Sequence, residues 1–270
     1  MPQLPISDGN SLFYLHTAPT RAGAPTFVFV NALTGSTDAW EAVVAPSLRE
    51  QGFGTLSYNF RGQTDSPFSA DMELTNDVIV DDLVKLMQSL TPARPILTGL
   101  SVGGLYAAQA IARGMEAEAL VLLNTLRRIG PRIAWVNDAL PTLVAEGGVQ
   151  MFLDALFPLL VNPEFAAGAR PNFLNGGYAP LDAGHGHMNL MRNSPATNWD
   201  MDWSSLSLPV LSITGEHDRV FRDADVIDEL FATLPNARRE DWGDCGHLIP
   251  NERPEKLAAS LIAFGAEHMA

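Results

Sequence analysis

The sequence predicts an α/β fold, with a mostly parallel, doubly wound sheet and a helical cap insertion. Short apolar runs alternate with amphipathic segments along most of the chain, which is typical of parallel strands joined by helices. The alternation stops over residues 125–200, where short apolar segments are separated by Pro, Gly and Asn. A chain of 270 residues is long enough to bury one large core.

The expected strands are short apolar runs bounded by turn residues. They cover residues 12–16, 26–30, 55–59, 95–98, 120–123, 210–214 and 238–242. The expected helices carry apolar residues at helical spacing, as Ile79, Leu83 and Leu86 do. They cover residues 39–50, 76–90, 102–113, 224–234 and 253–268.

The interrupted region predicts two units, a core domain of residues 1–124 and 201–270 and a helical cap of residues 125–200. Leu153, Leu156 and Leu160 repeat at helical spacing inside the cap, so it is expected to be helical. Most of its aromatic side chains are expected in the cap's own core, and one or two of them in an apolar pocket.

The composition limits the classes of molecule that the protein is expected to bind. A formal net charge of -14 argues against nucleic acid and anionic membranes. The longest apolar segment, near 152–161, contains Asp154 and Pro158, and the first 30 residues lack a secretory pattern, so we expect a cytoplasmic protein with no membrane partner. The single cysteine, Cys245, excludes an internal disulfide and is expected to be buried and unreactive. The sequence leaves open whether the protein forms a homo-oligomer.

No cofactor and no metal are expected. His185 and His187 lie close together in the sequence, but no carboxylate cluster accompanies them, so they are interpreted as cap-loop residues with a remote chance of contacting substrate.

The segment Gly99-Leu100-Ser101-Val102-Gly103 is the strongest chemical signal. It follows an expected strand and precedes an expected helix, the context in which G-x-S-x-G forms a nucleophile elbow. Glycines two residues before and after the serine leave room for neighbouring backbone in a tight turn. The following helix directs its free N–H groups at an oxyanion formed on Ser101.

A serine hydroxyl needs a base, and the base needs a third group to hold it. Asp218 follows the strand at 210–214, and His247 lies in a later glycine-bounded loop, so they are the expected acid and base. Glu216 and Asp244 are the alternative acids. His217 is the alternative base, although its position beside Asp218 would point it away from that acid.

The backbone N–H groups of Leu33 and Val102 are expected to form an oxyanion hole, because Leu33 lies in the loop after the strand at 26–30. The alternative for Leu33 is a core position.

These motifs resemble the α/β-hydrolase superfamily over essentially the whole chain. The elbow, the Gly215-x-x-Asp218 turn, the Gly246-His247 loop and the turn at 61–66 carry the resemblance, with Thr64 where a glycine is usual. Asn31-Ala32 stands in place of the family's His-Gly pair. The segment 31–33 is similar to 3-oxoadipate enol-lactone hydrolases and aminoacrylate hydrolases. The resemblance implies the α/β-hydrolase fold, with residues 125–200 as the variable cap that sets substrate choice.

Together these features predict a serine hydrolase acting on a small carboxylic ester or lactone. The same residues would also serve acyl transfer, carbon–carbon bond cleavage or a lyase reaction, and a non-catalytic receptor on this fold is a further alternative. Arg127, Arg128 and Arg132 at the cap's entry suggest a clamp for a substrate carboxylate, with Arg128 and Trp135 as the expected substrate contacts. The alternative is a solvated helix face.

Overall fold

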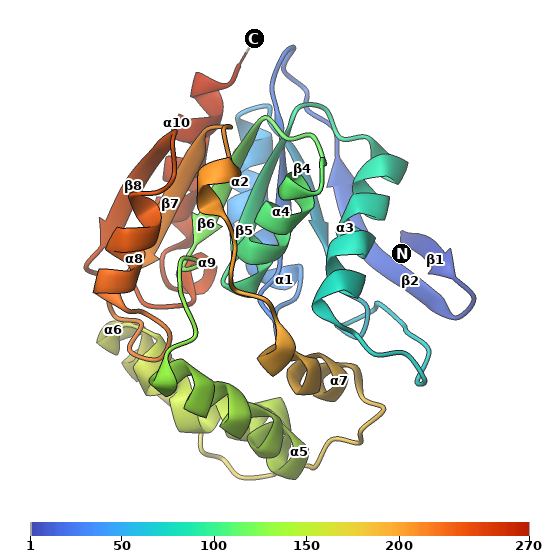
Figure 1. Ribbon diagram of the computed structural model, residues 1–270, viewed down its shortest axis with the longest axis vertical. Coiled ribbons are helices and arrows are strands. Elements are labelled where there is room, and N and C mark those ends of the chain that lie inside the picture. The colour runs from blue at the N-terminus through green and yellow to red at the C-terminus, as the bar shows by residue number, and fades with distance from the viewer. Residues whose placement is uncertain (1, 270) are drawn as a thin grey trace.

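The computed structural model describes residues 2–269, in which eight strands form a single sheet in the order β1-β2-β4-β3-β5-β6-β7-β8 (Figure 1). The strands are β1 (Gln3–Ser7), β2 (Asn10–Thr17), β3 (Thr26–Val30), β4 (Gly54–Tyr58), β5 (Pro95–Leu100), β6 (Ala119–Leu123), β7 (Val210–Gly215) and β8 (Ala237–Trp242). All pairs from β4 to β8 are parallel, while β1 and β2 run antiparallel to their neighbours. The predicted fold class is confirmed.

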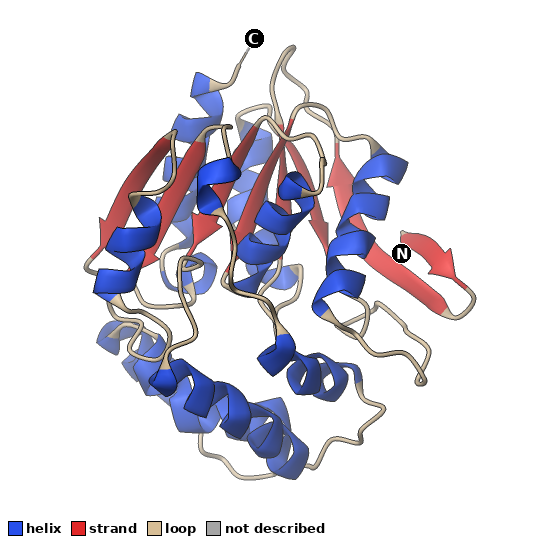
Figure 2. Ribbon diagram, viewed as in Figure 1, coloured by secondary structure: helices blue, strands red, loops and turns tan. Residues whose placement is uncertain are grey.

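Helices cover both faces of the sheet (Figure 2). One face packs against α3 (Asn76–Leu90), α4 (Val102–Ala112) and α8 (Ala224–Phe231), and the other against α2 (Val44–Glu50) and α10 (Pro254–Glu267). The central strands are buried on both faces, which explains why each of them is a continuous apolar run.

Two predicted elements differ from the structure. The predicted helix 39–50 is two helices, α1 (Asp38–Glu41) and α2, because the backbone at Val43 leaves the helical region with φ -141°. Strand β1 was not predicted. Its alternately exposed residues include Pro5, so it presents no apolar run to recognise.

The segment between β6 and β7 lies across the ends of the strands (Figure 1). It holds α5 (Pro131–Leu160), α6 (Pro163–Ala169), η1 (Arg170–Asn172), α7 (Gly186–Asn193) and η2 (Ser194–Ala196), followed by η3 (Trp203–Ser205). The short helix α9 (Ile249–Glu252) follows β8. The division into a core domain and a cap at residues 124/125 and 200/201 stays a prediction.

Helix α5 is long and apolar, and by length and composition alone it could cross a membrane. Gly148, at φ 71°, interrupts it and divides it into two arms. Phe152 and Leu160 on its second arm are buried against Met191 of α7 and other residues. We therefore interpret α5 as part of the helical segment that lies across the strand ends, and not as a membrane-spanning helix.

Candidate active site

Ser101 lies on the tight turn between β5 and α4, with φ 58° and ψ -122°. A Cβ at Gly99 would come within 2.3 Å of the Gly104 nitrogen, and one at Gly103 within 2.3 Å of the Val30 carbonyl oxygen. Only glycine fits at both positions. The strained serine backbone and its close neighbours have the geometry that the sequence predicted for the elbow.

Asp218 and His247 are brought together from the loops after β7 and β8. His247 Nδ1 lies 2.7 Å from Asp218 Oδ2, and both side chains are buried. The other carboxylate oxygen, Oδ1, accepts hydrogen bonds from the backbone N–H groups of Val220 and Phe221. Burial acts to raise the pKa of Asp218, but His247, the Phe221 N–H and the charge of Arg127 outweigh it and hold that pKa below its ordinary value.

The alternative acids and base lie elsewhere. Asp244 pairs with Arg253 and Lys256 at the surface, and Glu216 is exposed. The backbone N–H of His217 donates to the Cys245 carbonyl, and the ring in contact with Asp218 is that of His247. The geometry therefore favours Asp218 and His247 over these alternatives.

The loop that carries His247 is held from two sides. The buried carboxylate of Glu252 accepts from the backbone N–H groups of Gly246 and Leu248, and from the backbone and side chain of Asn162 beyond α5. On the other side, the Asn124 side chain donates to the carbonyl oxygens of Gly246 and His247. These bonds leave the His247 backbone little freedom to move.

A buried polar network fixes the loop after β3. Asn31 Oδ1 accepts from the indole N–H of Trp40 at 2.7 Å, and Asn31 Nδ2 lies 2.9 Å from Gln63 Oε1. The Gln63 amide then donates to the carbonyl oxygens of Ala32 and Leu33. Asn31 thus anchors the segment that carries the Leu33 N–H.

Leu33 and Val102 both line the pocket that contains Ser101 and His247. Within residues 2–269 neither of their backbone N–H groups donates a hydrogen bond. They are two unused backbone donors in the pocket that holds Ser101, one of them at the first turn of α4, and their role as an oxyanion hole stays a prediction.

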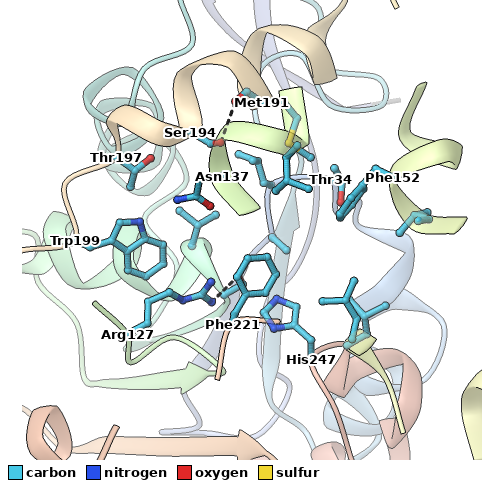
Figure 3. Close-up of a pocket in the computed structure, with 18 residues that line it drawn as sticks. Thr34, Arg127, Asn137, Phe152, Met191, Ser194, Thr197, Trp199, Phe221 and His247 are labelled. Carbon is cyan, nitrogen blue, oxygen red and sulfur yellow. Dashed lines mark hydrogen bonds between the residues drawn. The ribbon is translucent and has the colours of Figure 1, made fainter. Parts of the chain in front are cut away.

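The pocket encloses about 100 Å³ between the strand ends and the helices above them (Figure 3). Leu140, Phe152 and Met191 supply apolar lining from above, and Asn137, Thr197 and Thr34 supply polar groups. In the part of the chain that the structure describes, Arg127 is the one lining residue with a permanent charge. The pocket is thus small, mostly apolar and positively charged at one wall.

Arg127 contacts the serine directly. Its Nη2 lies 2.9 Å from Ser101 Oγ and 2.7 Å from the Asn124 carbonyl oxygen. Across residues 2–269 no hydrogen bond joins Ser101 Oγ to the His247 ring, although both groups line the pocket.

Arg128 and Trp135, the expected substrate contacts, lie outside the pocket lining. Arg128 forms an exposed ion pair with Glu229, and Trp135 is 80% exposed. Arg132 donates to a surface carbonyl oxygen, that of Arg222. Arg128 and Arg132 thus lie at the surface, as the alternative interpretation of a solvated face expected. Of the three clustered arginines, Arg127 lines the pocket.

The expectation that one or two cap aromatics line an apolar pocket is met by Phe152 and Trp199. Sequence reasoning missed Phe221, which lines the pocket beside Arg127. The available signal was position: residues that follow the carboxyl ends of parallel strands gather at one edge of the sheet, and Arg127 comes shortly after β6.

Cys245 is buried as expected, while His187, expected in a cap loop together with His185, lies within α7. Cys245 is fully buried, and burial raises the pKa of its thiol. His185 caps the first turn of α7, where its Nδ1 accepts from the His187 backbone N–H.

Comparison with known proteins identifies the family. A sequence model of the alpha/beta hydrolase fold matches residues 25–254. The chain belongs to the alpha/beta hydrolase fold family. The predicted resemblance to this superfamily is therefore confirmed, and membership classes the chain as a hydrolase enzyme.

Individual members of this family are distant from the chain. It is 25% identical to a non-heme chloroperoxidase of Streptomyces lividans, over 96% of this chain and 97% of the relative. An enol-lactonase of Burkholderia xenovorans shares the fold with a TM-score of 0.78 and 24% identity, over 97% and 99% of the two chains. A thermophilic esterase of Thermogutta terrifontis, solved with malate bound, has a TM-score of 0.78 and 21% identity, over 97% and 95%.

Proposed function

We propose that this hydrolase is a serine enzyme that cleaves a small carboxylic ester or lactone through an acyl-enzyme intermediate. The observation that carries the proposal is the buried 2.7 Å contact between His247 and Asp218, in a pocket whose floor is the strained Ser101 turn. A serine, an imidazole and a carboxylate with these relations are the groups that acyl transfer to a serine needs.

In the proposed reaction Ser101 Oγ attacks the substrate carbonyl while His247 Nε2 takes its proton. Oγ first turns from Arg127 Nη2 toward the imidazole, since its hydrogen bond in the free enzyme is to Arg127. Asp218 accepts the Nδ1–H bond, which fixes the ring's tautomer and stabilises the imidazolium.

The developing oxyanion would lie against the N–H groups of Leu33 and Val102, with the first turn of α4 adding its dipole. Losing one such donor costs about 3 kcal/mol of transition-state stabilisation. His247 returns the proton to the leaving oxygen, and water repeats the sequence on the acyl-enzyme. Apart from the substrate and this water, every group in these steps belongs to the protein.

The lining supports a small substrate. The space of about 100 Å³ has apolar walls, so it would favour a short acyl group over a long chain. The fold neighbours described as an esterase and an enol-lactonase are consistent with this class of substrate.

Labelling with a fluorophosphonate tests the proposal. We expect one covalent adduct on the wild type, none on Ser101→Ala and an unchanged adduct on Ser194→Ala, a serine that lines the same pocket and donates to the Met191 carbonyl. Ser101→Ala should also abolish hydrolysis of short activated esters. Labelling that persists in Ser101→Ala would contradict the proposal.

A further inference from the structure

Arg127 is buried in the pocket without a carboxylate partner among residues 2–269. Its side chain is 4% exposed, and its hydrogen bonds run from Nη2 to two neutral oxygens, Ser101 Oγ and the Asn124 carbonyl. Within the described residues, Nε and Nη1 donate to no protein group. A buried guanidinium normally pairs with an acid, because an unpaired buried charge is costly.

The negative charge of Asp218 acts on Arg127 and raises its pKa, but Asp218 is not its ion-pair partner. Its two oxygens are already engaged, one by His247 and the other by the N–H groups of Val220 and Phe221. No ion pair joins Asp218 to Arg127 in the described part of the chain. Burial consequently lowers the pKa of Arg127 to about 10, with Asp218 opposing that shift only in part.

Two aromatic rings fix the plane of the guanidinium (Figure 3). The Arg127 Cζ lies 4.6 Å from the ring centre of Trp199 and 4.7 Å from that of Phe221. Phe221 in turn packs 4.9 Å from the His247 ring, with the two ring planes tilted by 47°, so Arg127 and the catalytic imidazole contact the same phenyl ring. The donors of a guanidinium all lie along its planar edge, and since no described residue engages Nε and Nη1, this edge can still bind a planar anion.

We propose that this edge binds a carboxylate of the substrate, so that the enzyme acts on a half-ester or on a lactone that carries a free carboxylate. The inference rests on the proposed function, because it places the carboxylate relative to the carbonyl that Ser101 attacks. Arg127 Nη2 is 2.9 Å from Ser101 Oγ, so the bound carboxylate lies only a few bonds from the scissile carbonyl. The ligand supplies the negative charge that the buried guanidinium lacks.

A carboxylate at this position also releases the nucleophile. Nη2 now donates to Ser101 Oγ, and an anion is a stronger acceptor than a hydroxyl. Once Nη2 turns to the carboxylate, Oγ is free to donate to His247. The charged substrate thereby gains in reaction rate as well as in binding.

Two esters of matched length test the inference. Methyl butyrate and monomethyl succinate differ in whether a methyl group or a carboxylate ends the acyl chain. We expect wild-type kcat/KM to favour monomethyl succinate, and Arg127→Gln to reduce the ratio of the two kcat/KM values by about 10- to 100-fold, as loss of charged hydrogen bonds does. Arg127→Lys keeps the charge but not the fork, and should retain part of the preference.

The ratio of the two substrates is the readout, because Arg127 also touches Ser101 and its loss can slow both reactions together. Arg128→Gln is the matched control, since that arginine pairs with Glu229 at the surface and should change neither rate. Calorimetric titration of Ser101→Ala with monomethyl succinate gives a second measurement, and Arg127→Gln in that background should abolish the binding.

Equal wild-type rates for the two esters, or an unaltered ratio in Arg127→Gln, would overturn the carboxylate inference and leave the proposed function standing. Loss of the proposed function has a different signature, which is hydrolysis of both esters that survives in Ser101→Ala.

Discussion

Arg61 and Arg127 are equally buried, at 4% exposure each, but their surroundings differ. Arg61 lies in the loop after β4 and forms two parallel bonds to Asp82 of α3, at 2.6 and 2.8 Å. Arg127 lies at the wall of a pocket, between two aromatic rings and without an acid of its own among residues 2–269.

This difference separates two uses of a buried charge. The Arg61–Asp82 pair is closed within the protein and joins α3 to the loop after β4, so we expect its loss to reduce the stability of the fold. The charge of Arg127 is left open toward a space where a ligand can enter, so its loss would be felt in substrate binding. Substitutions of the acids near each arginine test this contrast.

We expect Asp218→Asn to have the largest effect. Asp218 is the acid whose charge acts on Arg127. We expect kcat to fall about 10⁴-fold, because an amide at this position no longer holds the required tautomer of His247. The folded state should change far less, since Asp218 is not the ion-pair partner of Arg127. Ester hydrolysis and urea unfolding measure the two quantities.

Asp244→Asn is the control for Asp218→Asn, because Asp244 was the alternative acid in the sequence and pairs only with surface cations. It should leave kcat unchanged. If Asp218→Asn instead unfolded the protein and spared the activity of the folded fraction, Asp218 would belong with Asp82 and the contrast would fail.

Asp82→Asn should have the opposite pattern. Arg61 would then be buried without its counter-charge, which costs about 3–5 kcal/mol of the free energy of unfolding. The kcat of the folded fraction should equal that of the wild type. The neighbouring Asp81→Asn, which removes only an exposed pair with Arg113, should cost less than about 1 kcal/mol.

Glu252→Gln tests an intermediate case, a buried carboxylate that is satisfied by N–H donors and also holds the base loop. An amide has one acceptor oxygen, so it cannot keep the bonds that Glu252 makes to Gly246, Leu248 and Asn162. We expect a loss of about 2 kcal/mol in stability and a lower kcat with little change in KM. The exposed Glu164→Gln is its control, and a Glu252→Gln enzyme with wild-type kcat would remove Glu252 from the positioning of His247.

The strands and helices of the core were predictable because each carries its own local pattern. Helix α3 and strand β3 match their predicted bounds, since one has a single apolar face and the other is a buried apolar run between turns. Strand β1 was missed because it is half-exposed. The break at Val43 was missed although the sequence signals it: Pro46, in the first turn of α2, has no N–H to bond the Ala42 carbonyl, so one continuous helix is disfavoured there.

The site divides in the same way. Ser101, Asp218 and His247 could be predicted as a group because each has a motif in a fixed chain order. Arg127 and Arg128 are adjacent in a stretch without regular structure, where no periodicity tells which of them faces inward. Trp135 was chosen as a contact, and lies exposed outside the pocket lining, for a related reason: an apolar helix such as α5 does not show from its sequence which aromatic residue turns to solvent.

The smallest effect concerns the pH dependence of stability. His247 and Arg127 help to hold the pKa of Asp218 below its ordinary value of 3.8, so in mild acid the unfolded chain binds more protons at this position than the folded one. The contribution of Asp218 to stability is therefore complete above that ordinary value and is lost as the pH falls through the lowered one. The difference in free energy of unfolding between wild type and Asp218→Asn should shrink over this acid range, and Arg127→Gln should narrow the range because it removes one of the charges that lower the pKa. A difference that stays constant down to the lowest pH of the titration would mean that these neighbours do not stabilise the charged form of Asp218. The charge of Arg127 would then have no effect on the pKa of Asp218 in the Asp218–His247 pair.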